Sequence, residues 1–194
     1  NYIGRILRYY LQIFILFNNN IKTKYIYMKI IIRHSLSVIV LTVIALRIYL
    51  HDPQPQYSGK KEVPGLDSPV EIFTDNYGVP HIFAENESDL FFAAGYQTAR
   101  DRLFQLSLVI SASRGTLASF FGNDFLNDDI YLRTWGIHNT AKEILKKTDQ
   151  KTLRILQKTC EGINARIDEL DGKYPLEFKL LGVAPLEINP VDII

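Results

Sequence analysis

The chain has 194 residues, which is enough for one domain with a sizeable hydrophobic core. The net charge is only +1 and the lysines and arginines are scattered, so we expect no nucleic-acid partner. There is one cysteine, Cys160, which excludes an intramolecular disulfide. Its apolar, helix-periodic position predicts a buried and unreactive thiol.

Residues 1–27 consist almost entirely of Asn, Tyr, Ile, Leu, Phe, Lys and Arg, the amino acids that AT-rich DNA encodes. The first residue is Asn1, and the only methionine is Met28. We therefore interpret residues 1–27 as translated upstream sequence that is not native, with Met28 as the true start. The alternative is a genuine basic and hydrophobic extension.

Residues 28–50 have the layout of an export signal, because Lys29 and Arg33 precede an apolar run at 35–46. No small-residue cleavage site follows, and residues 30–50 are just long enough to span a bilayer. We predict an uncleaved signal anchor, with a cleaved signal peptide as the alternative. The positive charges ahead of the segment predict a body that is exported, either periplasmic or anchored to the membrane outside the cytoplasm.

Residues 51–68 read HDPQPQYSGKKEVPGLDS, and the three prolines and two glycines predict an extended or irregular linker. Ser58 and Lys61 have the S-x-x-K spacing of serine β-lactamases. That chemistry needs both side chains on one helical turn, and no K-T-G or S-D-N follows, so we interpret the spacing as chance.

A short hairpin opens the body of the chain, residues 69–194. Residues 70–74 alternate between apolar and polar side chains, Asn76-Tyr77-Gly78 has turn chemistry, and residues 79–84 form a second short strand. Asn86 or Ser88 is expected to cap the helix that follows.

Three helices are predicted after the hairpin. Asp89 suits the first turn of the first helix, and a second helix is expected from about Thr134 to Lys147, with Glu143 and Lys147 paired. The third helix ends at Asp171-Gly172, and residues 174–185 are expected to form a loop-rich connector. The first and third helices carry apolar stripes with spacings of three and four residues, at Phe92, Tyr96, Ala99, Leu103, Leu106 and Ile110, and at Leu153, Leu156, Cys160, Ile163, Ile167 and Leu170.

No pattern in the sequence identifies an active site. The four histidines, His34, His51, His81 and His138, are isolated, and we interpret His81 as a structural residue of its strand. The acidic residues Asp124, Asp128 and Asp129 do not have EF-hand spacing, so they predict a solvated loop that caps the next helix.

Two further polar positions are interpreted as structural. Asp101 and Arg102 lie within an apolar helix and predict a partly buried ion pair or network that fixes packing. Asn164 is expected to hold a neighbouring loop through its side chain. We therefore assign no catalytic, cofactor-binding or metal-ligating residue in this chain.

Four patches of the body, within about residues 66–194, form a recognisable series: Asp75–Ile82 with Ala84; Gly95, Tyr96, Ala99 and Asp101–Gln105; Arg114, Gly115, Leu117, Ala118, Gly122, Arg133, Gly136 and Ala141; and Glu161–Ala165, Pro175, Glu177, Phe178, Leu181, Gly182, Pro185 and Asp192. In this order they resemble the penicillin acylase family of N-terminal-nucleophile amidohydrolases. The chain departs from that family near Ser111-Ala112, where members commonly have arginine, and at Ile188, where they have tryptophan.

The resemblance implies an α+β fold that is part of a four-layer αββα sandwich, with this chain as most of a largely helical small subunit. It implies a precursor that cleaves itself and exposes a serine as the first residue of a large catalytic subunit, the partner of this chain. The resemblance places that serine far downstream, beyond Ile194. The chain ends on a fresh apolar segment, so we interpret it as a truncated chain or a fragment. The reaction implied is hydrolysis of the amide bond of small N-acyl substrates such as β-lactams or N-acyl-homoserine lactones.

The resemblance implies no cofactor in this fragment and structural calcium in the complete protein. A second hypothesis is a membrane-tethered, non-catalytic scaffold or the product of a decayed gene. For the isolated chain we expect aggregation and no amidase activity, because its apolar helix faces would lack partners.

Overall fold

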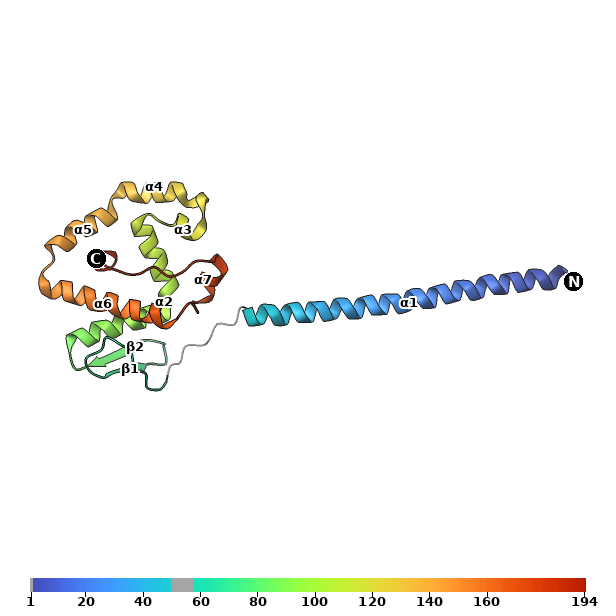
Figure 1. Ribbon diagram of the computed structural model, residues 1–194, viewed down its shortest axis with the longest axis horizontal. Helices are drawn as coiled ribbons and strands as arrows, with labels where there is room; N and C mark the ends of the chain where they lie inside the picture. The colour runs from blue at the N-terminus through green and yellow to red at the C-terminus, as the bar shows by residue number, and fades with distance from the viewer. Residues whose placement is uncertain (1, 50–57) are drawn as a thin grey trace. The chain divides into compact units, whose positions relative to one another are not determined.

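The computed structural model describes residues 2–49 and 58–194, and the chain divides into two compact units with the boundary after His51 (Figure 1). The first unit is one helix, α1 (Tyr2–Tyr49). By length and composition alone, α1 can cross a membrane. Its 48 residues make a helix about 70 Å long, which exceeds the roughly 30 Å hydrocarbon core of a bilayer.

The predicted export segment therefore lies on a helix, and that helix runs through Met28 without interruption. The choice of Met28 as the start, and the choice between anchor and cleaved signal, stay predictions. Leu50, at the end of the predicted anchor, and residues 51–57 of the predicted linker, with His51 among them, lie outside the described residues. Residues 58–69 contain turns and bends without helix or strand, as the glycines and prolines predict.

The second unit opens with the predicted hairpin, in which β1 (Val70–Thr74) pairs with β2 (Pro80–Ala84) in antiparallel register. Pro80 begins the second strand, one residue later than predicted. Alternate side chains of both strands are partly buried, and the others face outward. Gly78 takes a φ of 80° in the turn, which a residue with a side chain rarely adopts.

The helix α2 (Glu87–Arg114) follows and confirms the first apolar stripe. Asn86 is its N-cap, and its side chain accepts the backbone N–H of Asp89 at 2.8 Å. Five of the six predicted stripe residues are buried, and the sixth, Leu106, is partly buried and packs against the core. The backbone departs from helical angles at Arg102, so α2 is kinked near its middle.

The helix α6 (Gln150–Glu169) packs against α2 and forms the main helix pair of the unit. Gly95 of α2 and Gly162 of α6 lie at the contact, where each faces the backbone of the other helix. The core between and around these helices is made of Ala99, Leu103, Ile110, Phe120, Cys160, Ile163, Phe178 and Ile188.

Short helices complete the unit. The predicted helix at 134–147 is wrong at its beginning, because two helices meet at Gly136, whose φ of 72° interrupts the α conformation. The predicted connector at 174–185 also contains a helical turn and a half, with Phe178 fully buried. The elements are α3 (Ala118–Phe121), η1 (Asn123–Phe125), α4 (Leu126–Trp135), α5 (Ile137–Lys147), α7 (Leu176–Leu181) and η2 (Pro190–Asp192).

Figure 1 shows the red C-terminal segment running among the helices of this unit, and η2 contacts α2, α5 and α6. Ile188, just ahead of η2, is buried in the core. The described part of the chain is thus mostly helical with one two-stranded antiparallel hairpin, which confirms the α+β class.

Candidate functional site

The hairpin turn is held by Asp75. Its Oδ1 accepts the backbone N–H groups of Tyr77 and Val79, each at 2.9 Å. Its Oδ2 lies 3.3 Å from Nε2 of His81. The hydrogen bond from Val79 contributes most to lowering the pKa of Asp75 below its ordinary value. His81 is half exposed and contacts the ring of Phe73, which is the position of a structural histidine on the outer face of the hairpin.

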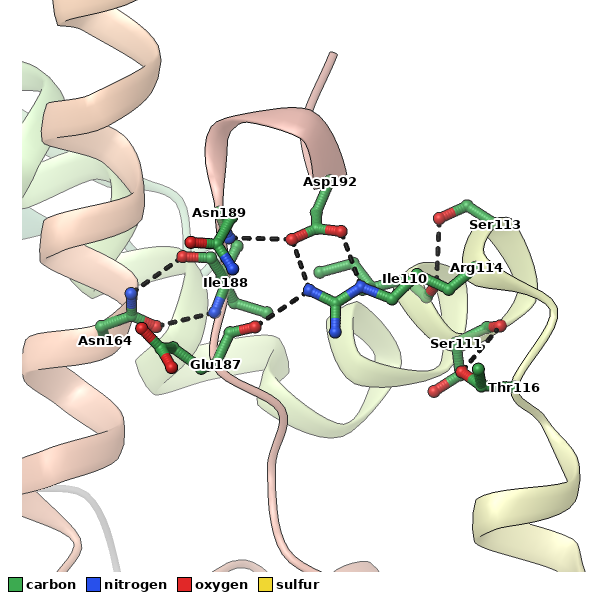
Figure 2. A network of polar contacts seen from close by, with 10 residues as sticks. All are labelled: Ile110, Ser111, Ser113, Arg114, Thr116, Asn164, Glu187, Ile188, Asn189 and Asp192. Carbon is green, nitrogen blue, oxygen red and sulfur yellow. Dashed lines mark hydrogen bonds and ion pairs between the residues drawn. The ribbon is translucent and has the colours of Figure 1, made fainter. Parts of the chain in front are cut away.

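A network of polar contacts holds the C-terminal segment (Figure 2). Arg114, the last residue of α2, donates from Nε to Oδ1 of Asp192 at 2.7 Å and from Nη2 to Oδ2 at 2.5 Å. The same Nη2 donates to the carbonyl of Glu187 at 3.0 Å. Hydrogen bonding to Asp192 raises the pKa of Arg114, so the guanidinium stays charged. The two parallel hydrogen bonds fix the orientation of the guanidinium against the carboxylate of Asp192.

Asn164 of α6 holds the same segment from the other side. Its Nδ2 donates to the carbonyl of Ile188 at 2.9 Å, and its Oδ1 accepts the N–H of Ile188 at 3.0 Å. Figure 2 shows the amide of Asn164 facing the backbone of Ile188. The predicted role of Asn164 as a clamp on a neighbouring loop is confirmed.

The carboxylate of Asp192 also accepts the backbone N–H of Asn189 at 2.8 Å, which closes a capping box on η2. Residues 187–192 are therefore fixed both to the C-terminal end of α2 and to α6, two helices that are distant in sequence. We call Arg114, Asn164 and Asp192 the C-terminal clamp. Arg114 belongs to the third patch of the family resemblance, and Asn164 and Asp192 belong to the fourth. The fold brings these two patches together.

The acidic residues near 124–129 do not form the predicted solvated loop. Asp129 lies in the first turn of α4 and is buried, and its carboxylate accepts the N–H groups of Leu117 at 2.6 Å and Ala118 at 2.9 Å. From the same helix, Arg133 donates to the carbonyl of Gly115 at 2.8 Å. Asp129 and Arg133 therefore join α4 to the turn that follows α2, whereas Asp124 and Asp128 are exposed.

The prediction of a partly buried ion pair or network holds for Asp101 but not for Arg102, which is exposed. Asp101 accepts from Nε2 of Gln97 at 2.7 Å and lies 3.5 Å from Nε of Arg100. Its partners are therefore the residue one turn before it and the residue next to it on the N-terminal side.

Sequence reasoning missed the role of Asp89, which it placed only as a favourable charge in the first helical turn. The side chain is buried and accepts the N–H groups of Asp67 at 2.9 Å and Ser68 at 2.8 Å, and the amide of Asn86 at 2.6 Å. Burial raises the pKa of a carboxyl group, but these hydrogen bonds outweigh burial and lower the pKa of Asp89. Asp89 therefore fixes the end of the predicted linker to the body.

No group of three or more His, Cys, Asp and Glu side chains in the described ranges is arranged to hold a metal ion. Cys160 is buried, and desolvation raises the pKa of its thiol to about 12, so the nucleophilic thiolate is not formed near neutral pH. The buried and unreactive thiol predicted from sequence is confirmed. The network around the C-terminal clamp positions backbone and contains no nucleophile beside a base.

Comparison with known proteins explains this arrangement. The model of the penicillin amidase family matches residues 69–194. The chain belongs to the penicillin amidase family. This match covers the hairpin, α2, α6 and the whole C-terminal clamp.

Individual proteins of known name also match this chain, in agreement with the family match. The chain is 32% identical over 136 residues to penicillin acylase 2 proenzyme of Pseudomonas sp. (strain SE83), which covers 70% of this chain and 17% of the relative. It is 32% identical over 130 residues to penicillin G acylase of Escherichia coli, covering 65% of this chain and 15% of the relative. It is 28% identical over 141 residues to acyl-homoserine lactone acylase QuiP of Pseudomonas fluorescens (strain Pf0-1), covering 73% and 17%.

A solved structure of thermostable penicillin G acylase from Alcaligenes faecalis is similar in fold, with a TM-score of 0.59 and 25% identity, covering 64% of this chain and 68% of that chain. The chain spans about one sixth of the length of the curated penicillin amidase relatives that it matches.

Proposed function

We propose that this chain is the N-terminal part of a self-processing amidohydrolase that hydrolyses the amide bond of N-acyl compounds. The observation that carries the proposal is the family match over residues 69–194. The relatives are named as penicillin acylases and as an acyl-homoserine lactone acylase, so the proposed substrates are β-lactams with an acyl side chain or N-acyl-homoserine lactones.

The nucleophile in this proposal is a serine downstream of the chain, exposed as the first residue of a large subunit when the precursor cleaves itself. An α-amine titrates near pH ~8, so a substantial fraction is neutral at working pH and can take the proton of the adjacent hydroxyl. Hydrogen-bond donors aimed at the developing oxyanion lower the barrier for acyl transfer. Every reacting group of this scheme lies outside the present chain.

The exposed apolar surface of the body supports a large partner. On the hairpin, Phe73 and Phe83 are 60% and 62% exposed on the outer face. On α4, Ile130, Tyr131 and Trp135 are exposed together, and the rings of Tyr131 and Trp135 contact each other. Apolar patches of this kind are covered in stable proteins, and the rest of the precursor is the proposed cover.

The proposed location is outside the cytoplasm, with α1 as an anchor or as the signal that directs export. The length and composition of α1 and the positive residues ahead of the apolar run support it. Structural calcium is proposed for the complete protein only, with ligands from the rest of the precursor, because the described residues include no suitable group.

The test compares two products in one assay. The complete reading frame and the 194-residue chain are expressed in parallel and incubated with a phenylacetyl amide, a penicillin and a long-chain N-acyl-homoserine lactone, and release of the amine is measured. We expect release by the complete product only, and loss of that release when the serine at the processing site is changed to alanine. Absence of hydrolysis with all three substrates would favour the second hypothesis, a membrane-tethered scaffold without catalysis.

A further inference from the structure

The helix α5 carries an apolar stripe that is not buried. The members of the stripe have the i, i+4, i+7, i+8 spacing of a helix that packs on a core, and they are Ile137, Ala141, Ile144 and Leu145. Ile137 and Ile144 are nevertheless 44% and 50% exposed, and α5 contains no buried residue. The stripe of the same kind on α6 has no exposed member. The packing of α5 is therefore incomplete.

The opposite face of α5 is charged. Its exposed charged residues are Lys142, Glu143, Lys146 and Lys147, and Nζ of Lys146 donates to Oε1 of Glu143 at 2.7 Å. Burying an unpaired charge is costly, and no charged side chain belongs to the apolar stripe. An apolar segment can therefore lie along the stripe without burying a charge.

The end of the chain is held beside α5. The short helix η2 contacts α5, and two hydrogen bonds from Arg114 to Asp192 fix η2 within the C-terminal clamp. Figure 1 shows the C-terminus inside the arc that α4, α5 and α6 make. Ile193 packs against the core, whereas Ile194 is 41% exposed. Residues that follow Ile194 therefore start next to α5, and they continue an apolar run.

The relatives are long enough to supply a covering segment. This chain spans about one sixth of the length of the curated relatives, and about one third of the solved Alcaligenes faecalis chain lies outside the structural match. The helix α5 has 11 residues and is about 16 Å long. A turn followed by a second helix of that length needs only about 20 residues.

We propose that the residues directly after Ile194 form an apolar segment that packs on Ile137 and Ile144 and completes the burial of α5. The inference rests on the proposed function, because it needs the longer precursor. A segment that is joined to the edge of this face by a short connection has an effective concentration on the order of millimolar. A second copy in dilute solution, or a part of the precursor joined through a longer stretch, has a lower one.

The test uses the product of the complete reading frame, in which the photoreactive residue p-benzoylphenylalanine replaces Ile144. After irradiation and digestion, mass spectrometry identifies the cross-linked peptides. We expect the partner peptide to lie within about 20 residues after Ile194. In the control the same photoreactive residue replaces Lys146, on the charged face of α5, and no cross-link to that segment is expected.

Other partners at Ile144 would overturn the proposal. A partner peptide from the large subunit would show that a distant part of the precursor covers α5. A cross-linked product with twice the mass of the chain would show a second copy, and a cross-link to lipid would show a membrane surface. Equal cross-linking from Ile144 and Lys146 would also overturn it, because the apolar stripe would then have no preference.

A second measurement follows the covering segment itself. In the complete product, Ile137→Ser with Ile144→Ser removes the two half-exposed side chains of the stripe, and hydrogen exchange is measured in the 20 or so residues after Ile194. Burying half of each isoleucine is expected to slow exchange roughly 30-fold, so the double variant should exchange that much faster. Phe73→Ser with Phe83→Ser, on the outer face of the hairpin, is the matched control and should leave this exchange unchanged. Equal effects of the two double variants would overturn the proposal.

Failure of the proposed function gives a different result. Neither measurement needs catalysis, so both are repeated after the serine at the processing site is changed to alanine, and the same contact is expected. A product without amidase activity that still forms the cross-link would refute the proposed function and support this inference. An active product whose cross-link from Ile144 lies elsewhere would overturn this inference alone.

Discussion

The contact between α2 and α6 gives the sharpest prediction, because it leaves no room for a side chain at Gly162. A Cβ atom added there would lie 1.9 Å from the carbonyl oxygen of Phe92, whereas ordinary contacts begin at 3.4 Å. The difference, 3.4 − 1.9, requires the helices to separate by about 1.5 Å. A gap of only ~0.5–1 Å already removes a quarter to a half of a van der Waals contact.

The cost of Gly162→Ala follows from the side chains beside this contact. Phe92, Tyr96 and Ile163 are buried there, and burial of each such side chain stabilises by roughly 2 kcal/mol. Losing about half of that for three residues costs about 3 kcal/mol, and the better helix propensity of alanine returns about 1 kcal/mol. The net expectation is a loss of about 2 kcal/mol.

Hydrogen exchange of peptides from α2 and α6 in the full chain measures this change, because slow exchange reports the free energy of opening. A loss of about 2 kcal/mol corresponds to roughly 30-fold faster exchange. Gly95→Ala should act in the same direction, because a Cβ atom there would lie 2.1 Å from the carbonyl oxygen of Thr159. Gln157→Ala, on the exposed face of α6, is the control and should leave exchange nearly unchanged. If Gly162→Ala exchanged at the rate of this control, the close helix contact would be refuted.

Three further predictions concern single polar groups. Asp89→Asn should destabilise the unit by about 1–3 kcal/mol in urea titrations followed by hydrogen exchange, because one charged acceptor of several hydrogen bonds is lost. The folded pKa of Asp89 is lowered, so its contribution is present above the ordinary carboxyl pKa near ~4 and is lost as the pH falls through the folded value; a variant with the same acid sensitivity as the parent would contradict this. Arg114→Lys should speed exchange in residues 187–192, because lysine does not reproduce the two parallel bonds to Asp192, and unchanged exchange there would count against the C-terminal clamp. Cys160 should react with iodoacetamide only after unfolding, since its thiol pKa is about 12, and rapid labelling of the folded chain would disprove its burial.

The sequence predicted the elements whose signals are local and periodic. The alternation of apolar and polar residues predicted the hairpin, and the apolar stripes predicted α2 and α6, because each pattern follows from one buried face of its element. The role of Asn164 was also predicted, since a polar side chain within an apolar helix needs a partner. The partner itself, the backbone of Ile188, is 24 residues away and follows only from the fold.

The elements that sequence reasoning missed are those whose signals are not periodic. The helix α4 buries little except Asp129, so it has no apolar stripe, and an acidic run was interpreted as a loop. The helix break at Gly136 depends on the left-handed conformation of that one residue. The short helix α7 depends on the burial of one ring, that of Phe178. The roles of Asp89 and of the facing glycines depend on contacts between distant segments, which no single window of sequence contains.

The central claim is that this chain is the scaffold of a larger, self-processing amidohydrolase. The most direct test is the intact mass of the product of the complete reading frame, combined with N-terminal sequencing of each chain found. The account predicts two chains, the larger one starting with serine and the smaller one containing the matched residues 69–194. A single uncleaved chain, or a second chain that starts with a residue other than serine, threonine or cysteine, would contradict it.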